Sequence, residues 1–99
     1  MGLGMQMVYL GFAGSAAIEA EAGVQLLRLE RFGKLLKSCH LAIEEVHGSD
    51  SSQTYDVRLD LVTVSRDFSP VAHHCGPDPL VVMREAFDEA EHELETNSA

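Results

Sequence analysis

Three features are scarce in this sequence, and each scarcity excludes a class of protein. No apolar run approaches the roughly 18 residues that a membrane-spanning helix needs, so we predict no membrane contact. The first residues lack the basic and long apolar segments of a secretory signal, which makes the cytoplasm the expected compartment. The two cysteines, Cys39 and Cys75, have no spacing motif between them, so we expect free thiols rather than a disulfide.

Positive charge is scarce as well. The 99 residues include 7 Lys and Arg against 16 Asp and Glu, which gives a net charge of -9. Because non-specific binding to nucleic acid depends on Lys and Arg, we expect no binding to DNA. The cations that exist are concentrated, since four of the seven lie in one short stretch: Arg28, Arg31, Lys34 and Lys37. Cations at a helix end also complement the helix dipole, so a structural role and a phosphate contact both remain open for this group.

No catalytic constellation is present. The sequence has no nucleophile elbow, no glycine-rich phosphate loop and no cysteine pairs at zinc-site spacing, so we predict no enzyme activity and no cofactor. His73, His74 and Cys75 are the weak metal candidates, because their side chains are soft or borderline ligands. Adjacent residues rarely all point at one ion, and a role in an ordinary loop is the alternative.

The first half of the chain predicts a strand, a helix and a second strand. Residues 5–12 have high strand propensity. Ser15 is the expected cap of a helix, and Gly33, free to take a positive φ, is expected to close it. Residues 36–46 read as the second strand. The buried stripe of the helix follows helical spacing: Ile18, Ala22, Leu26 and Leu29.

The second half predicts two further strands and a second helix. Residues 55–62 alternate apolar and polar side chains, and a short strand at 68–72 is confined to a sheet edge by Pro70. Arg58 and Asp60 share the solvent face, where cross-strand pairing is expected. A turn is predicted at residues 65–67. Asp78 and Pro79 start the last helix, whose buried face is predicted to be Met83, Phe87, Ala90 and Leu94.

These elements predict one α+β domain of order β-α-β-β-β-α over residues 1–99, with flexible ends at 1–4 and 96–99. Both helices are expected on one face of a mostly antiparallel four-stranded sheet. Because a helix joins the first two strands, those two can run parallel.

Four segments resemble the ribosome hibernation-promoting factor family, also known as ribosome-associated inhibitor or sigma-modulation proteins. They span nearly the whole chain in the family's order. They are Ser15 with residues 17–20 (AIEA), residues 29–32 (LERF) with 38–44 (SCHLAIE), residues 55–61 (YDVRLDL), and residues 72–74 (AHH) with 82–90 (VMREAFDEA) and 94–95 (LE).

The resemblance implies a non-catalytic protein of the small ribosomal subunit. It would lie in the decoding channel, contact ribosomal RNA with cations on both helices, and block messenger and transfer RNA during stasis. Such contacts are made mainly to phosphates and 2′-hydroxyls. The positions of this chain that would carry them are Arg28, Arg31, Lys34, Lys37, Arg58 and Arg84.

The sequence also departs from the family. Gly23 and Gln25 stand where the first helix commonly carries Arg or Lys, and residues 91–93 (EHE) replace a segment that is usually basic. The loop at residues 48–53 lacks the cations of similar proteins. The alternative is therefore a divergent relative whose acidic helix face binds a basic protein partner or a second copy in a homodimer.

Overall fold

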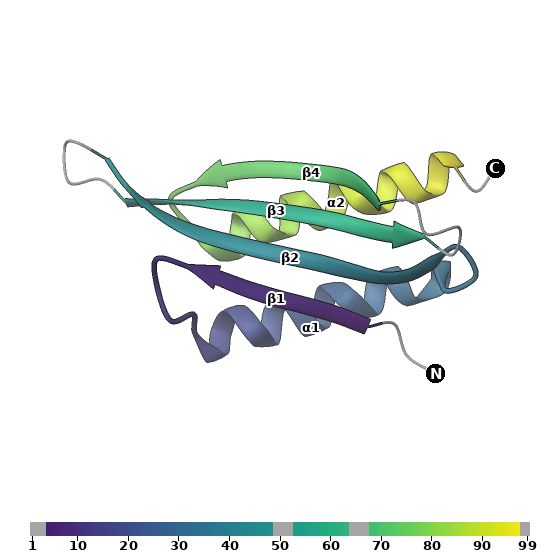
Figure 1. Ribbon diagram of the computed structural model, residues 1–99, viewed down its shortest axis with the longest axis horizontal. Helices are drawn as coiled ribbons and strands as arrows, with labels where there is room; N and C mark the ends of the chain where they lie inside the picture. The colour runs from purple at the N-terminus through teal and green to yellow at the C-terminus, as the bar shows by residue number, and fades with distance from the viewer. Residues whose placement is uncertain (1–3, 49–52, 64–67, 98–99) are drawn as a thin grey trace.

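The computed structural model describes residues 4–48, 53–63 and 68–97, and it has the predicted order of elements (Figure 1). The chain forms a four-stranded sheet with two α-helices and one short 3-10 helix. The elements are β1 (Gly4–Leu10), α1 (Ala16–Leu29), the 3-10 helix η1 (Glu30–Phe32), β2 (Leu36–His47), β3 (Gln53–Thr63), β4 (Phe68–Gly76) and α2 (Pro79–Asn97). The predicted turn at residues 65–67 and most of the loop at 48–53 lie outside the described residues.

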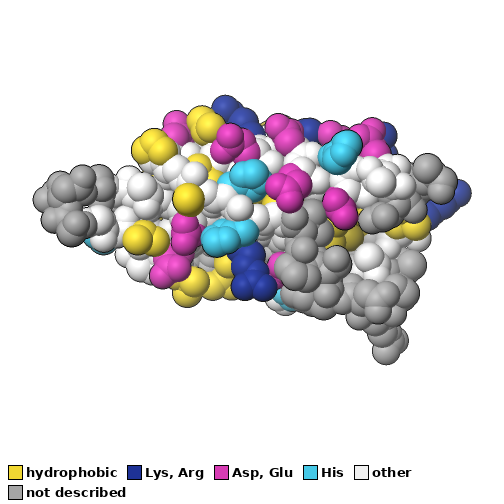
Figure 2. Space-filling view, turned by 90° about the horizontal axis from the view of Figure 1, so that it is seen from above, with side chains coloured by type: hydrophobic (Ala, Val, Ile, Leu, Met, Phe, Trp, Pro, Cys, Tyr) yellow, Lys and Arg dark blue, Asp and Glu magenta, His cyan; other side chains and the backbone are white. Residues whose placement is uncertain are grey.

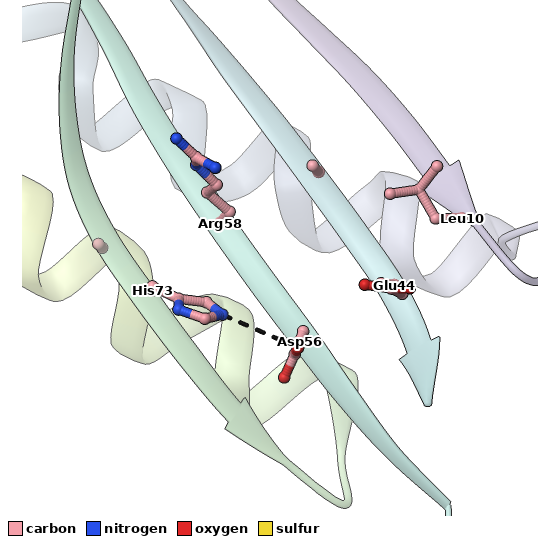
Figure 3. A pocket seen from close by; sticks show the side chains of 7 residues that line it. Leu10, Glu44, Asp56, Arg58 and His73 are labelled. Carbon is pink, nitrogen blue, oxygen red and sulfur yellow. Dashed lines mark ion pairs between the residues drawn. The ribbon is translucent and has the colours of Figure 1, made fainter. Parts of the chain in front are cut away.

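The sheet has the strand order β1-β2-β3-β4. β1 runs parallel to β2, and the next two pairs are antiparallel. Both helices cover one face of the sheet, and the other face is open, as Figures 1 and 3 show. The predicted α+β architecture is confirmed, including the parallel first pair that the helical connection permits.

Helix α1 begins as predicted but ends differently. The Ser15 hydroxyl accepts a hydrogen bond from the Ile18 amide over 3.2 Å, which caps the first turn. Gly33 has a φ of -58°, so the prediction of a left-handed cap was wrong. The helix instead tightens into η1, and the Gly33 amide donates to the Glu30 carbonyl. A 3-10 turn satisfies terminal carbonyls without a positive φ, so the backbone conformation there does not call for glycine.

Helix α2 buries the face that the sequence predicts. The Asp78 carboxylate accepts a hydrogen bond from the Leu80 amide over 2.9 Å at the helix start. The helix continues through Asn97, beyond the end predicted from sequence. Its inward side chains enter the core with almost no exposed surface: Val82, Met83, Ala86, Phe87, Ala90 and Leu94.

Strand β4 is longer than predicted. It extends to Gly76 and so includes His73, His74 and Cys75, which the sequence placed in a loop. The register with β3 shifts between Leu59 and Asp60, next to Pro70. Because β4 is an edge strand, a proline with no amide proton is accommodated as expected. The local bulge lets the strand continue past it.

Three aromatic side chains pack together near the turn between β1 and α1. The Tyr9 and Phe12 rings meet edge to face at a centroid distance of 5.4 Å, and Phe12 meets Tyr55 at 5.5 Å. Gly14 has a φ of +80°, and a Cβ there would lie 2.5 Å from the Tyr9 ring. This position therefore requires glycine both for its backbone and for space.

In the described part of the chain no helix is long and apolar enough to cross a membrane.

Candidate nucleic-acid interface

The six cations predicted to contact RNA fall into three places. Arg28 on α1, Arg31 on η1 and Arg84 on α2 lie along the line where the two helices meet. Lys34 and Lys37 lie in the connection from η1 to β2 and at the start of that strand. Arg58 is on the open face of the sheet, opposite the helices (Figure 3). The fold therefore gathers three of the six and separates the rest.

Arg28 is the centre of the interhelical contacts. Its guanidinium lies 2.8 Å from the Asp88 carboxylate and 2.6 Å from that of Glu91, both on α2. It also donates a hydrogen bond of 2.6 Å to the Gln25 amide oxygen, and the Gln25 nitrogen donates to Glu21 over 2.7 Å. Gln25 can be buried because both the oxygen and the nitrogen of its side-chain amide form hydrogen bonds. Sequence periodicity placed Leu26 in that stripe and missed the buried glutamine.

Two further arginines extend the same contacts along the helices. Arg31 lies 3.2 Å from Glu91 and 3.0 Å from Glu95, and its guanidinium carbon is 4.4 Å from the centroid of the Phe32 ring. Arg84 lies 3.0 Å from Glu21 on the other helix. We call these three arginines and their carboxylates the interhelical ladder: Arg28, Arg31 and Arg84 with Glu21, Asp88, Glu91 and Glu95.

The ladder lowers the pKa of two of its carboxylates, Glu91 and Glu21. Hydrogen bonds from Arg28, and secondarily from Arg31, lower the pKa of Glu91 below its ordinary value of 4.5, although partial burial opposes this effect. Hydrogen bonds from Arg84 and then Gln25 lower the pKa of Glu21 in the same direction. A phosphate approaching these arginines must therefore compete with carboxylates that are already bound.

The surroundings of the ladder are acidic as well. The helical segment 16–32 and helix α2 together carry nine Asp and Glu residues but three arginines. Neighbouring charges on one helix lie closer together than the Debye length of about 8 Å at physiological salt, so salt does not remove their effect on a ligand. The helix layer thus lacks the positive potential that phosphate binding requires.

Lys34 and Lys37 differ from the helical arginines because no described residue pairs with them. Both are exposed, and neither forms an ion pair or hydrogen bond with any described residue. With Arg31 they occupy the end of the molecule where η1 meets β2. They are the predicted site residues whose charge is available to a ligand.

The open face of the sheet has a shallow hollow of about 540 Å³ that the sequence did not predict as a site. Figure 3 shows Glu44, Asp56, Arg58 and His73 around it, and the His73 ring lies 3.9 Å from the Asp56 carboxylate. Arg58 pairs with Asp60 of its own strand at 3.4 Å rather than across strands, so that expectation was wrong. The alternation of charged side chains in β2 and β3 was the sequence signal for this surface. Its mixed charges favour neither anions nor cations.

The weak metal candidates do not form a cluster. Because they lie in a strand, alternate side chains point to opposite faces. His73 borders the open hollow, whereas His74 lies 2.8 Å from Glu89 of α2. Within residues 4–48, 53–63 and 68–97 no group of three metal-ligating side chains occurs.

The strand order β1-β2-β3-β4 with two helices on one face of the sheet defines an α+β fold class. Known structures share this fold. No protein-family model and no curated protein sequence matches the chain. A ribosomal subunit interface protein from Coxiella burnetii matches with a TM-score of 0.71 at 13% identity, covering 97% of this chain and 98% of that one. The N-terminal domain of Protein Y from Thermus thermophilus matches with a TM-score of 0.67 at 14% identity, with coverages of 97% and 98%. The chain has the fold of these proteins over nearly its full length.

Proposed function

We propose that this protein is a non-catalytic, ribosome-associated factor of the cytoplasm that binds the small subunit and limits translation. The observation that carries the proposal is the full-length match in fold to a protein described as a ribosomal subunit interface protein. The ordered sequence segments that resemble hibernation factors support the same function. The proposal requires no catalytic group and no cofactor.

Within this proposal the junction of η1 and β2 makes the main contact with RNA phosphates. Lys34 and Lys37 are exposed and unpaired among the described residues, so they can bind a phosphate without breaking an existing ion pair. Arg31 can join them by exchanging one carboxylate, because its side chain is exposed and solvent weakens its ion pairs. Arg28 and Arg84 act mainly within the interhelical ladder, and Arg58, paired with Asp60 on the other face of the sheet, is not part of this contact.

The test is co-sedimentation with purified small subunits over a range of salt concentrations. Lys34→Gln with Lys37→Gln is expected to weaken binding and to reduce the slope of log affinity against log salt by roughly two, about one for each phosphate contact. Gln53→Glu with Thr54→Glu is the matched control. It changes the net charge by the same amount at the opposite end of the sheet and should leave the slope near the wild-type value.

Wild-type protein that fails to co-sediment at low salt would overturn the proposal. Binding that is unaffected by the lysine substitutions would remove the junction from it and leave ribosome association standing. A stationary-phase lysate fractionated on a sucrose gradient tests the same association in the cell.

A second candidate function follows from the acidic helix layer. Four of its nine carboxylates already hold all three helical arginines in ion pairs, and the acidic excess that is left suits an Arg- and Lys-rich protein segment better than RNA. Fluorescence anisotropy of a labelled poly-arginine peptide measures this. Glu85→Gln with Glu93→Gln, two exposed residues outside the ladder, should weaken peptide binding and leave subunit binding unchanged or stronger.

A further inference from the structure

The two edges of the sheet are protected very differently. β4 contains Pro70, a register shift and two histidines, one of which is paired with Glu89 of α2. Figure 2 looks onto this side of the molecule and shows acidic and histidine side chains gathered there. Proline, bulges and charged groups are the means by which natural sheets prevent an edge from pairing with another chain. β4 therefore has the features that discourage pairing with another strand.

β1 has none of these protections. Its seven residues, GMQMVYL, include no proline and no charged or histidine side chain. Its pairing with β2 runs without a register shift from Gly4 to Leu10. The outer edge of such a strand presents a regular row of unpaired backbone donors and acceptors.

β1 also leaves apolar surface uncovered on both faces of the sheet. On the open face, Val8 is 50% exposed and Leu10 is 46% exposed. On the helix-covered face its side chains are only partly buried, whereas their cross-strand neighbours in β2 are fully buried. The neighbouring pairs are Met5 with Cys39, Met7 with Leu41, and Tyr9 with Ile43. A strand added beside β1 would complete the core on one face and cover Val8 and Leu10 on the other.

The distribution of charge indicates which kind of partner would bind beside β1. Residues 1–18 contain no Asp, Glu, Lys, Arg or His, in a chain whose net charge is -9. Two copies approaching through the helix layer would bring carboxylates together, whereas β1 itself carries no charged side chain in either copy. A basic partner would gain nothing from this neutral edge. An antiparallel pair about a two-fold axis places each β1 against itself, so a single uncharged strand is complementary to its own copy.

We propose that β1 is the contact edge of a homodimer in which two copies pair their β1 strands antiparallel and form one continuous sheet. The contact uses main-chain hydrogen bonds for affinity and Val8 and Leu10 for apolar cover. It leaves the junction of η1 and β2 free, so it does not depend on the proposed ribosomal function.

Sedimentation equilibrium of the purified chain over a wide concentration range tests the proposal. The wild type should dimerise as concentration rises. Val8→Lys, which places a charge on the edge strand, should raise the dimer dissociation constant by on the order of tenfold or more. The matched control is Val81→Lys on α2, where the wild-type residue is 46% exposed, and this variant should dimerise like the wild type.

Leu27→Lys separates this edge from the outer surface of α1, where Leu27 is 65% exposed. If Leu27→Lys dissociates the dimer and Val8→Lys does not, the contact lies on α1 and the proposal is wrong. Wild-type protein that stays monomeric at millimolar concentration also overturns it.

Hydrogen exchange on the wild type gives a readout that needs no substitution. Amides of residues 4–10 should gain protection as concentration rises, while those of β4 should not change. Added protection in β4 instead of β1 contradicts the proposal, even if Val8→Lys fails to fold.

Discussion

The helix-covered face of the sheet and its open face come from alternate residues of the same strands, yet they differ in almost every property. The covered face holds Cys39, Leu41 and Ile43 with no more than 1% of their surface exposed. The open face presents Glu44, Asp56 and Arg58 around a shallow hollow. Stability therefore comes mainly from one face of this small domain, while substitutions on the other face can alter binding at little cost to the fold.

The largest effect is expected in the core beneath the helices. Phe87 is fully buried, so Phe87→Ala should lower the free energy of unfolding by about 3–5 kcal/mol through lost apolar contacts and the cavity left behind. That is a large share of the roughly 5–15 kcal/mol typical of a domain. Urea unfolding measures it. Val81→Ala, on the exposed side of the same helix, should change stability by less than about 0.5 kcal/mol.

The two cysteines provide a matched pair across the sheet. Cys39 is fully buried, and burial raises the pKa of its thiol to about 11, whereas Cys75 is exposed. Cys39→Ser should cost about 1–3 kcal/mol because a hydroxyl enters an apolar site with poor hydrogen bonding. Cys75→Ser should be nearly neutral. Equal melting temperatures for the two variants would contradict the assignment of the faces.

A smaller effect is expected from the interhelical ladder. Arg28 contacts Asp88, Glu91 and Gln25, but its side chain is 34% exposed, so solvent screens these interactions. Arg28→Ala should therefore destabilise the protein by about 1 kcal/mol. Arg58→Ala, which removes one long ion pair from the open face, should cost less than about 0.5 kcal/mol. A double-mutant cycle with Glu91→Gln measures the coupling across the helices.

The smallest effect concerns acid stability. The arginines lower the pKa of Glu91 and Glu21 below 4.5 in the folded chain, so the folded state binds protons less readily than the unfolded chain. The resulting stabilisation is present above about pH 4.5 and is lost as pH falls through the folded pKa values. Melting curves between pH 3 and 6 should show a shallower decline for Glu91→Gln than for Glu85→Gln, an exposed substitution outside the ladder. Identical declines would mean that the ladder does not hold its carboxylates in solution.

Local sequence signals predicted most of the fold. Ser15 and Asp78 are helix caps because their side chains satisfy amides in the next turn, and this chemistry is readable from neighbouring residues. The alternation of apolar and polar side chains at residues 55–62 predicted the third strand, because successive side chains of a strand point to opposite faces of the sheet. Gly33 was misassigned because a 3-10 turn closes the helix without the conformation for which glycine is preferred.

The candidate site was harder to predict, because it depends on contacts between residues far apart in the chain. Arg28 and Glu91 are separated by 63 positions and meet only when α1 and α2 lie side by side. Composition indicated that cations were scarce, but not that the helical ones would be paired. Lys34 and Lys37 looked equivalent to Arg28 and Arg31 in the sequence, and the fold distinguishes them by the carboxylates that α2 places nearby.

The sequence by itself determined the order of the elements, the buried face of each helix and the acidic character of the molecule, since periodicity, capping and charge are local properties. The tertiary structure alone decided which cations among the described residues remain unpaired and that an uncharged strand stands at an edge. Those outcomes depend on which elements become neighbours, and neighbours are fixed by packing the whole chain around one core.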